Sequence, residues 1–194
     1  MNVETLFASE TQLWRTPEAL VRWIEERDGV PFGLDAAASD GLICEDYYGP
    51  GGRRSDAFTE PWLCPSHQRV FCNPPYDGAP MFLRQGMSSL RESRTIDRVV
   101  FLIAARTDTR WWHDYWHQWD EVVFLKGRLK FWLTPAEQAA INAAREARAV
   151  ALNRPFTPIA AENSAPFPSA LLYASTRLAG NVRAPQVSCV DWRG

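Results

Sequence analysis

The segment Asp97-Arg-Val-Val-Phe-Leu-Ile-Ala104 is apolar over almost its whole length. A continuous apolar run of this kind is typical of a parallel β-strand that is covered on both of its faces. Such a strand does not stand alone, because a sheet buried on both sides needs helices above and below it. The run therefore predicts a parallel strand of an α/β sheet.

Other segments on both sides of this run fit the same architecture. We expect strands wherever short apolar runs lie between turn residues, and helices wherever apolar residues recur every three or four positions. Strands that alternate with helices build a mostly parallel sheet, and such sheets bind ligands at the carboxyl ends of their strands. The predicted strands are 30–35, 69–72, 97–104, 121–125, 128–132 and 169–174, and the predicted helices are 16–27, 78–93, 108–119 and 134–151.

Capping signals define two of these helices. Thr16 is expected to be the N-cap of the first helix, with Pro17 in its first turn and Gly29 at its end. Thr134 and Glu137 form a capping-box pattern at the start of the last helix. The strands 121–125 and 128–132, separated by a turn at Lys126-Gly127, are predicted to form a β-hairpin, and residues 155–168 a proline-rich loop.

Length and composition indicate one globular domain. A chain of 194 residues can bury a sizeable core, and we expect residues 1–194 to form a single domain in which 133–167 is an insertion between the last two core strands. No apolar run reaches membrane-spanning length, and the amino terminus lacks the pattern of a signal peptide. We therefore expect a cytoplasmic protein that does not enter a membrane. The oligomeric state is not readable.

The sequence offers little evidence for a metal site. The four cysteines lack the spacing of zinc ligands. His113 and His117 are four residues apart and could share a helix face, but they stand among tryptophans and no third ligand is near. We expect both histidines to be partly buried packing residues, and we expect no metal.

The segment Phe71-Cys72-Asn73-Pro74-Pro75-Tyr76 carries the chemistry. A strand that ends at Asn-Pro-Pro-Tyr continues into a stiff turn, because each proline fixes φ and donates no amide hydrogen. The side-chain oxygen of Asn73 and the main-chain oxygen of Pro74 can then accept two hydrogen bonds from one NH2 group, with the ring of Tyr76 beside them. A plain proline turn with an exposed tyrosine is the competing interpretation.

Two fixed acceptors suit methylation of an aromatic amine. The lone pair of such an amine is delocalised into the ring, and acceptors that hold both N–H bonds stabilise the charge that grows on nitrogen during attack. Preorganised groups of this kind contribute about 3 kcal/mol each. A base within a duplex cannot reach such a site, so it must be flipped out, and we expect it to stack on Tyr76.

The same motif and its surroundings resemble the phage-type DNA N-6-adenine methyltransferases, in which Asn-Pro-Pro-Tyr is catalytic. The similar stretches occur in one order along nearly the whole chain: Trp14–Pro17, Gly33–Ala38, Cys44 with Tyr47–Tyr48, Phe71–Tyr76, Ala105–Trp112, Gly127–Phe131 and Ala165–Ala170. The resemblance implies a Rossmann-like class I methyltransferase fold, which is a mostly parallel twisted sheet with helices on both faces and an antiparallel C-terminal strand. It also implies a phage- or prophage-encoded enzyme of the bacterial cytoplasm that methylates adenine N6 in DNA.

The resemblance further assigns residues to roles. Asn73, Pro74, Pro75 and Tyr76 match the catalytic motif. The implied cofactor is S-adenosylmethionine, and the residues expected to bind it are Trp14, Thr16, Pro17, Asp35, Ala36 and Asn73. Asp35 is the carboxylate expected to bind the amino group of the cofactor's methionine part. One departure is that Ala36-Ala-Ala-Ser39 stands where many methyltransferases have a glycine-rich loop.

Several polar residues on the expected substrate rim are candidates for DNA contacts. Arg106, Asp108 and Arg128 follow strand ends or turns, and Arg53 and Arg54 lie in a glycine-rich loop, where they can meet phosphate. A surface network between Arg106 and Asp108, and a merely solvated loop at 49–54, are equally compatible with the sequence. The formal net charge of −2 does not favour DNA binding, although local patches can differ from the total.

Other functions share these features. The two acceptors fit any planar NH2 group, so adenine in RNA or the side-chain amide of a protein glutamine are alternative substrates. A catalytically silent methyltransferase-like DNA-binding module is an alternative of another class, and the acidic net charge and the glycine-poor loop favour it. The intact motif favours an enzyme. The target sequence is not readable, and the loop 49–56 and the segment 133–167 are the candidate places for its recognition.

Overall fold

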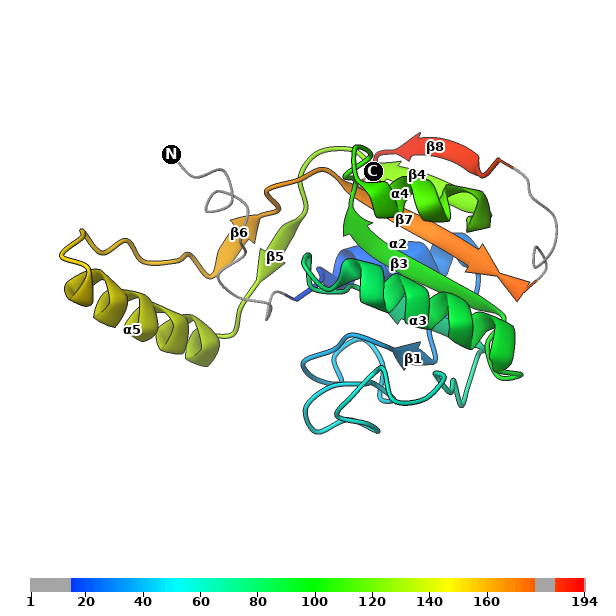
Figure 1. Ribbon diagram of the computed structural model, residues 1–194, viewed down its shortest axis with the longest axis horizontal. Helices are drawn as coiled ribbons and strands as arrows, with labels where there is room; N and C mark the ends of the chain where they lie inside the picture. Colours follow the sequence, from blue (N-terminus) through cyan, green and yellow to red (C-terminus); the bar gives the residue numbers. More distant parts are fainter. Residues whose placement is uncertain (1–14, 177–183, 194) are drawn as a thin grey trace.

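A computed structural model of the chain describes residues 15–176 and 184–193. Its main feature is a six-stranded sheet in the order β1-β2-β3-β7-β4-β8 (Figure 1). Strand β7 is antiparallel to both of its neighbours, and the other adjacent pairs are parallel. The strands are β1 (Leu34–Asp35), β2 (Arg69–Cys72), β3 (Arg98–Ala104), β4 (Glu121–Leu125), β7 (Ser169–Ser175) and β8 (Gln186–Val190). The protein is therefore an α/β protein with a largely parallel sheet, as expected.

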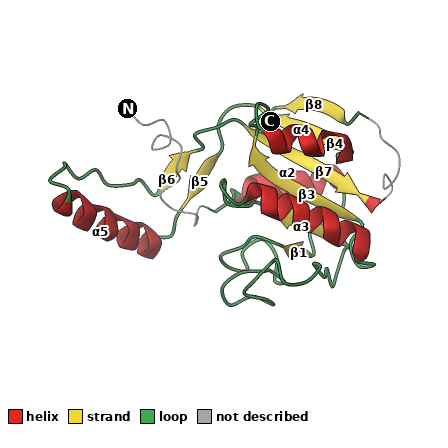
Figure 2. Cartoon of the chain, in the orientation of Figure 1, coloured by secondary structure: helices red, strands yellow, loops and turns green. Residues whose placement is uncertain are grey.

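Helices cover both faces of this sheet, and strand β3 explains why (Figure 2). Successive side chains of a strand point to opposite faces. Phe101 and Ile103 pack in the core formed with α3 (Ala79–Glu92) and α4 (Arg110–Tyr115), whereas Leu102 packs in the core formed with α2 (Glu18–Asp28). The prediction of a strand buried on both faces is confirmed, although β3 is parallel only to β2 and antiparallel to β7.

The start of α2 differs from the prediction. Pro17 occupies the N-cap position and makes no side-chain cap, so Thr16 is not the cap of this helix. The reason is that the Thr16 hydroxyl is buried and accepts a hydrogen bond from Asn73 instead. Gly29 ends the helix in the left-handed conformation (φ 69°), as predicted.

The predicted hairpin is wrong. Strand β4 is hydrogen-bonded to β7 on one side and to β8 on the other, so neither of its edges remains for β5 (Lys130–Trp132). Gly127, with φ 77°, turns the chain away from the sheet. Strand β5 instead pairs antiparallel with β6 (Glu162–Ser164) in a separate two-stranded sheet, and β6 lies within the segment that was expected to be a loop.

Between β4 and β7 the chain forms a projection, residues 126–168, which we call the arm (Figure 1). It contains β5, helix α5 (Pro135–Ala151) and β6. Helix α5 begins with the predicted capping box: Thr134 accepts from the Glu137 amide, and the Glu137 carboxylate accepts from the Thr134 amide. No residue of α5 is buried, and in Figure 1 the helix extends away from the main sheet.

The tryptophan-rich segment forms α4 and the 3₁₀ helix η1 (Trp116–Gln118). Trp112 and Trp119 are buried in the core, and this leaves His113 and His117 exposed to solvent, so the expectation that the histidines are partly buried is wrong. Among residues 15–176 and 184–193, no three metal-ligating side chains come together. In the same part of the chain, no helix is both long and apolar enough to cross a membrane.

Candidate active site

The catalytic candidate Asn73 lies directly after strand β2, at the edge of the sheet where the parallel strands end. The neighbouring strand β1 ends at Asp35, which pairs in register with Phe71. Parallel strands place their carboxyl ends side by side, so Asp35 and the start of the Asn73–Tyr76 motif lie next to each other.

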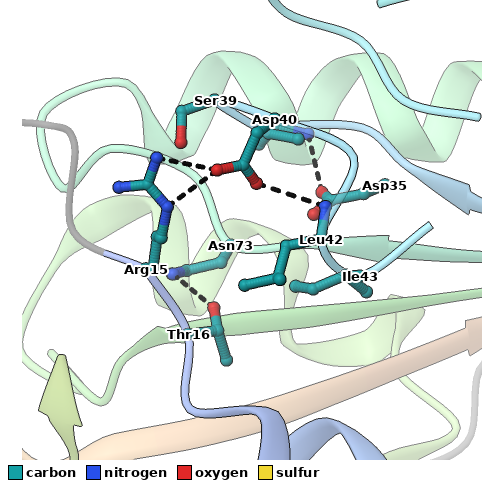
Figure 3. A pocket seen from close by; sticks show the side chains of 10 residues that line it. Arg15, Thr16, Asp35, Ser39, Asp40, Leu42, Ile43 and Asn73 are labelled. Carbon is teal, nitrogen blue, oxygen red and sulfur yellow. Dashed lines mark hydrogen bonds and ion pairs between the residues drawn. The ribbon is translucent and has the colours of Figure 1, made fainter. Parts of the chain in front are cut away.

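The side chain of Asn73 is held in one orientation by Thr16. The Asn73 Nδ2 donates a hydrogen bond of 2.9 Å to the Thr16 Oγ1, and the Thr16 side chain is itself buried (Figure 3). The amide oxygen of Asn73 therefore points away from Thr16. In the described part of the chain, no hydrogen bond uses this oxygen or the main-chain oxygen of Pro74, whereas the Pro75 oxygen accepts from the Gly78 amide at 3.0 Å.

Two hollows meet at Asn73. The first, of about 350 Å³ with its open mouth, is lined by polar residues that include Arg15, Thr16 and Asp35 (Figure 3). The second, of about 840 Å³ with its open mouth, lies beside it and is lined by Ala36, Tyr48, Gly49, Pro50, Ser55, Asp56, Ala57, Phe58, Pro75 and Phe82. Both hollows are bordered by the loop 37–39 and by Asn73. An elongated ligand with one charged and one aromatic end could span them.

Asp35 places a buried carboxyl group at the first hollow. Its side chain is buried, and its hydrogen bond to the described residues is one of 3.1 Å from the Ala37 amide. Burial raises the pKa of the Asp35 carboxyl to about 7, and the Ala37 amide only partly opposes this effect. A buried carboxylate without a cationic partner is costly, so the site favours a positively charged ligand group.

Arg15 connects the first hollow to the arm. Its guanidinium lies 2.7 Å from an Asp40 carboxylate oxygen, forms an ion pair with Glu137 at the start of α5, and stacks over Trp132 at 5.2 Å from the ring centroid. The hydrogen bond from Arg15 lowers the pKa of Glu137 to about 2. Arg15 was not predicted as a site residue, although it stands directly before Thr16 in the Trp14–Pro17 stretch.

Tyr76 is positioned by a residue of the arm. Its ring meets Phe167 edge to face, with centroids 5.8 Å apart, and the guanidinium of Arg106 lies 5.3 Å from the Phe167 ring centroid. Burial raises the pKa of Tyr76 to about 12, so its hydroxyl stays neutral at physiological pH. Phe167 was also missed as a site residue, because its sequence signal is only a phenylalanine between two prolines.

The remaining predicted residues are dispersed. Arg106 and Asp108 are exposed after β3 and form no ion pair with each other, and Arg128 is exposed at the base of the arm. Arg53 and Arg54 are engaged by carboxylates of their own region, at 2.7 Å from Asp46 and 2.5 Å from Glu60. Pro17 starts α2 and does not line either hollow, and Trp14 lies outside the described residues.

A sequence profile of the DNA N-6-adenine-methyltransferases (Dam) matches residues 4–170. The chain belongs to this family. The match with the Dam family includes β1, the Asn73–Tyr76 motif and the whole arm. It ends at Ala170, near the start of β7.

One curated relative is the DNA N-6-adenine-methyltransferase of Escherichia phage T1. It is 27% identical over 118 residues, which is 60% of this chain and 46% of the phage protein, so the chain matches less than half of that relative's length. No solved structure matches this Dam-family chain.

Proposed function

We propose that the protein transfers a methyl group from S-adenosylmethionine to the N6 amine of adenine in DNA. The observation that carries this proposal is the fixed Asn73 side chain, whose oxygen lies beside two hollows at the carboxyl edge of the sheet. Membership of the Dam family and the similarity to the phage T1 DNA N-6-adenine-methyltransferase support it.

The residues around the hollows fit the cofactor. Asp35 would bind the ammonium group of its methionine part, since the first hollow has a buried carboxylate that needs a cation. The second hollow, with Phe58, Phe82 and Pro75 in its wall, has the size and the apolar surface for an adenosine group. Ala36 has a small side chain at the join, which allows the close approach that glycine gives elsewhere. S-adenosylmethionine would supply an electrophilic methyl group on a sulfonium centre.

The chain's own residues would then act on the target amine. The oxygens of Asn73 and Pro74 would accept one hydrogen bond each from the two N–H groups of the amine and thereby hold its nitrogen toward the methyl donor. They would also stabilise the positive charge that develops on this nitrogen as its bond to the methyl group forms and the bond between methyl and sulfur breaks. The methylated nitrogen is then acidic enough to lose its extra proton to water, so a strong base is unnecessary. The ring of Tyr76, supported by Phe167, would stack on the flipped adenine.

The fold supports the same assignment. Helices on both faces, a parallel β1-β2-β3 region and a ligand-sized hollow at the carboxyl ends of its strands are features of Rossmann-like methyltransferases. We propose that the described elements form one such domain, with residues 133–167 as an insertion, in an enzyme of the bacterial cytoplasm encoded by a phage or prophage. Arg106, Asp108 and Arg128 remain the proposed DNA contacts of the rim.

Transfer of a labelled methyl group tests the proposal directly. The purified protein is incubated with S-adenosylmethionine labelled in its methyl group and, separately, with duplex DNA, RNA and a mixture of proteins. We expect label in DNA, and N6-methyladenine after digestion to nucleosides. Label in RNA or in protein glutamine but not in DNA would change the substrate, and no gain in thermal stability with the cofactor would indicate a silent binding module.

A further inference from the structure

We propose that the arm is the DNA-docking element of this protein, and that Arg148 and Arg154, near its outer end, contact phosphates of the duplex at a distance from the target base. This inference rests on the proposed function, because it assumes that the polymer brought to Asn73 is DNA. The basic arm would attract the DNA phosphates, which the chain as a whole, with its net charge of −2, does not attract.

The first support is the place where the arm is attached. The arm leaves the sheet after Leu125 and returns at Ser169, and Ser169 pairs with Ala104 at the end of β3. Both of its ends therefore lie at the same edge of the sheet as the catalytic motif. Phe167 of the arm contacts Tyr76, so a duplex bound along the arm would lie beside the site where the flipped base is received.

The second support is that α5 is unused by the protein core. It has 17 residues, which corresponds to a length of about 25 Å, and none of them is buried. One side of the helix holds the returning chain, where Gln138 donates to the Ile159 oxygen at 2.9 Å and Asn142 accepts from the Ile159 amide at 2.7 Å. The other side is left to solvent. Helices usually gain their stability from packing, so this helix has a surface available for a partner.

The third support is charge. The arm has six basic residues and three acidic ones, in a chain with 21 basic and 23 acidic residues, and the remainder is therefore strongly acidic. Glu137 is already neutralised by Arg15, and Glu162 lies 3.8 Å from Lys130. Arg148 and Arg154 are exposed and form no ion pair with a described residue. The positive surface is thus on the outer part of the arm, where a polyanion can approach it without meeting the acidic body.

A pair of double variants tests this inference. Arg148→Gln/Arg154→Gln removes two charges from the outer arm, and Arg91→Gln/Arg94→Gln removes two exposed charges near the end of α3, at the opposite edge of the sheet. We would measure the Kd for a fluorescent duplex that contains adenine, over a series of salt concentrations. We would also measure the Kd for S-adenosylmethionine and the circular dichroism spectrum.

We expect the arm variant to bind DNA at least about tenfold more weakly at 0.1 M salt, with a slope of log K against log salt reduced by about 2. The control variant should bind within about twofold of the unsubstituted protein, and neither variant should change cofactor affinity. DNA binding by the arm variant that equals that of the unsubstituted protein overturns the inference. The inference is also overturned if sedimentation shows that the unsubstituted protein is a dimer and the arm variant a monomer with unchanged affinity for DNA, since the arm would then bind a second copy of the chain.

The proposed function fails in a different way. If the unsubstituted protein binds DNA through Arg148 and Arg154 but transfers no methyl group to it, the docking inference stands and the methyltransferase proposal is refuted. If the unsubstituted protein methylates DNA and the arm variant does so with unchanged Kd and unchanged kcat/KM, the methyltransferase proposal stands and the docking inference is refuted.

Discussion

Replacement of Asp35 by Asn removes one negative charge from the floor of the first hollow while it keeps the size and shape of the side chain. The carboxyl is buried, and its hydrogen bond to the described residues comes from the Ala37 amide, so a cofactor ammonium would be its main electrostatic partner. A hydrogen bond to a charged group contributes about 1.5–3 kcal/mol. We therefore expect the Asp35→Asn variant to bind S-adenosylmethionine roughly 10- to 150-fold more weakly at pH 7.5.

The pKa of about 7 adds a pH dependence to this prediction. In the proposed assignment the ionised form of Asp35 would bind the ammonium, and the fraction of this form falls from about three-quarters at pH 7.5 to about one-tenth at pH 6. Cofactor affinity of the unsubstituted protein should therefore fall roughly five- to eightfold between these two pH values. The Asp35→Asn variant has no carboxyl at this position and should show almost no change in affinity over the same interval.

Isothermal titration calorimetry at pH 6 and 7.5 measures both effects. Asp114→Asn is the matched control, because Asp114 is an exposed aspartate of α4 that forms an ion pair with Arg110 and, among the described residues, lines neither hollow. Its affinity and its pH dependence should equal those of the unsubstituted protein. An Asp35→Asn variant that binds as tightly as the unsubstituted protein, or that keeps the same pH dependence, refutes the assignment of Asp35 to the cofactor's amino group.

The other predictions concern the groups around the target amine. Asn73→Ala should lower the single-turnover rate by about 10²- to 10³-fold and leave cofactor affinity within about twofold, because it removes one preorganised acceptor; substantial turnover would remove Asn73 from the mechanism. Thr16→Val should lower the single-turnover rate about tenfold, because it removes the hydroxyl that holds the Asn73 amide, whereas Thr16→Ser keeps the hydroxyl and should keep the rate of the unsubstituted protein. Equal rates for the two variants would contradict the positioning role of Thr16. Phe167→Ala should reduce kcat/KM for DNA about two- to tenfold through loss of its contact with Tyr76, with no change in cofactor Kd; a change in cofactor Kd alone would contradict this role.

The parts of the fold that were predicted correctly have local causes. Helix α5 follows from a capping box within four residues, and strand β2 follows from a short apolar run that ends at prolines. The pairing of β5 with β6 joins segments about thirty residues apart, and β6 has the polar sequence Glu-Asn-Ser, which carries no strand signal. A hairpin between β4 and β5 was the natural local prediction, but it failed because β7 and β8 occupy both edges of β4.

The same division applies to the candidate site. The positions of Asp35 and Asn73 at one edge of the sheet could be predicted, because Asp35 ends β1 and Asn73 directly follows β2; their chemical roles stay predictions. The hydrogen bond between Thr16 and Asn73 was not predicted, since it spans 57 positions in the chain. The ion pair of Arg15 with Glu137 spans 122 positions, and the contact of Phe167 with Tyr76 also depends on the tertiary arrangement. No local pattern encodes such contacts, so a single sequence does not predict them.

The attachment of the arm also bears on how proteins of this kind can diverge. Its two ends leave and re-enter the sheet beside each other, because Phe124 and Ala170 are paired neighbours on β4 and β7. A connection whose ends are already together can change length cheaply, since each doubling of a flexible loop costs only about 0.6 kcal/mol. A relative could thus exchange this whole segment for a longer or a shorter one, while the six-stranded sheet and the Asn73–Tyr76 motif beside it are inherited unaltered.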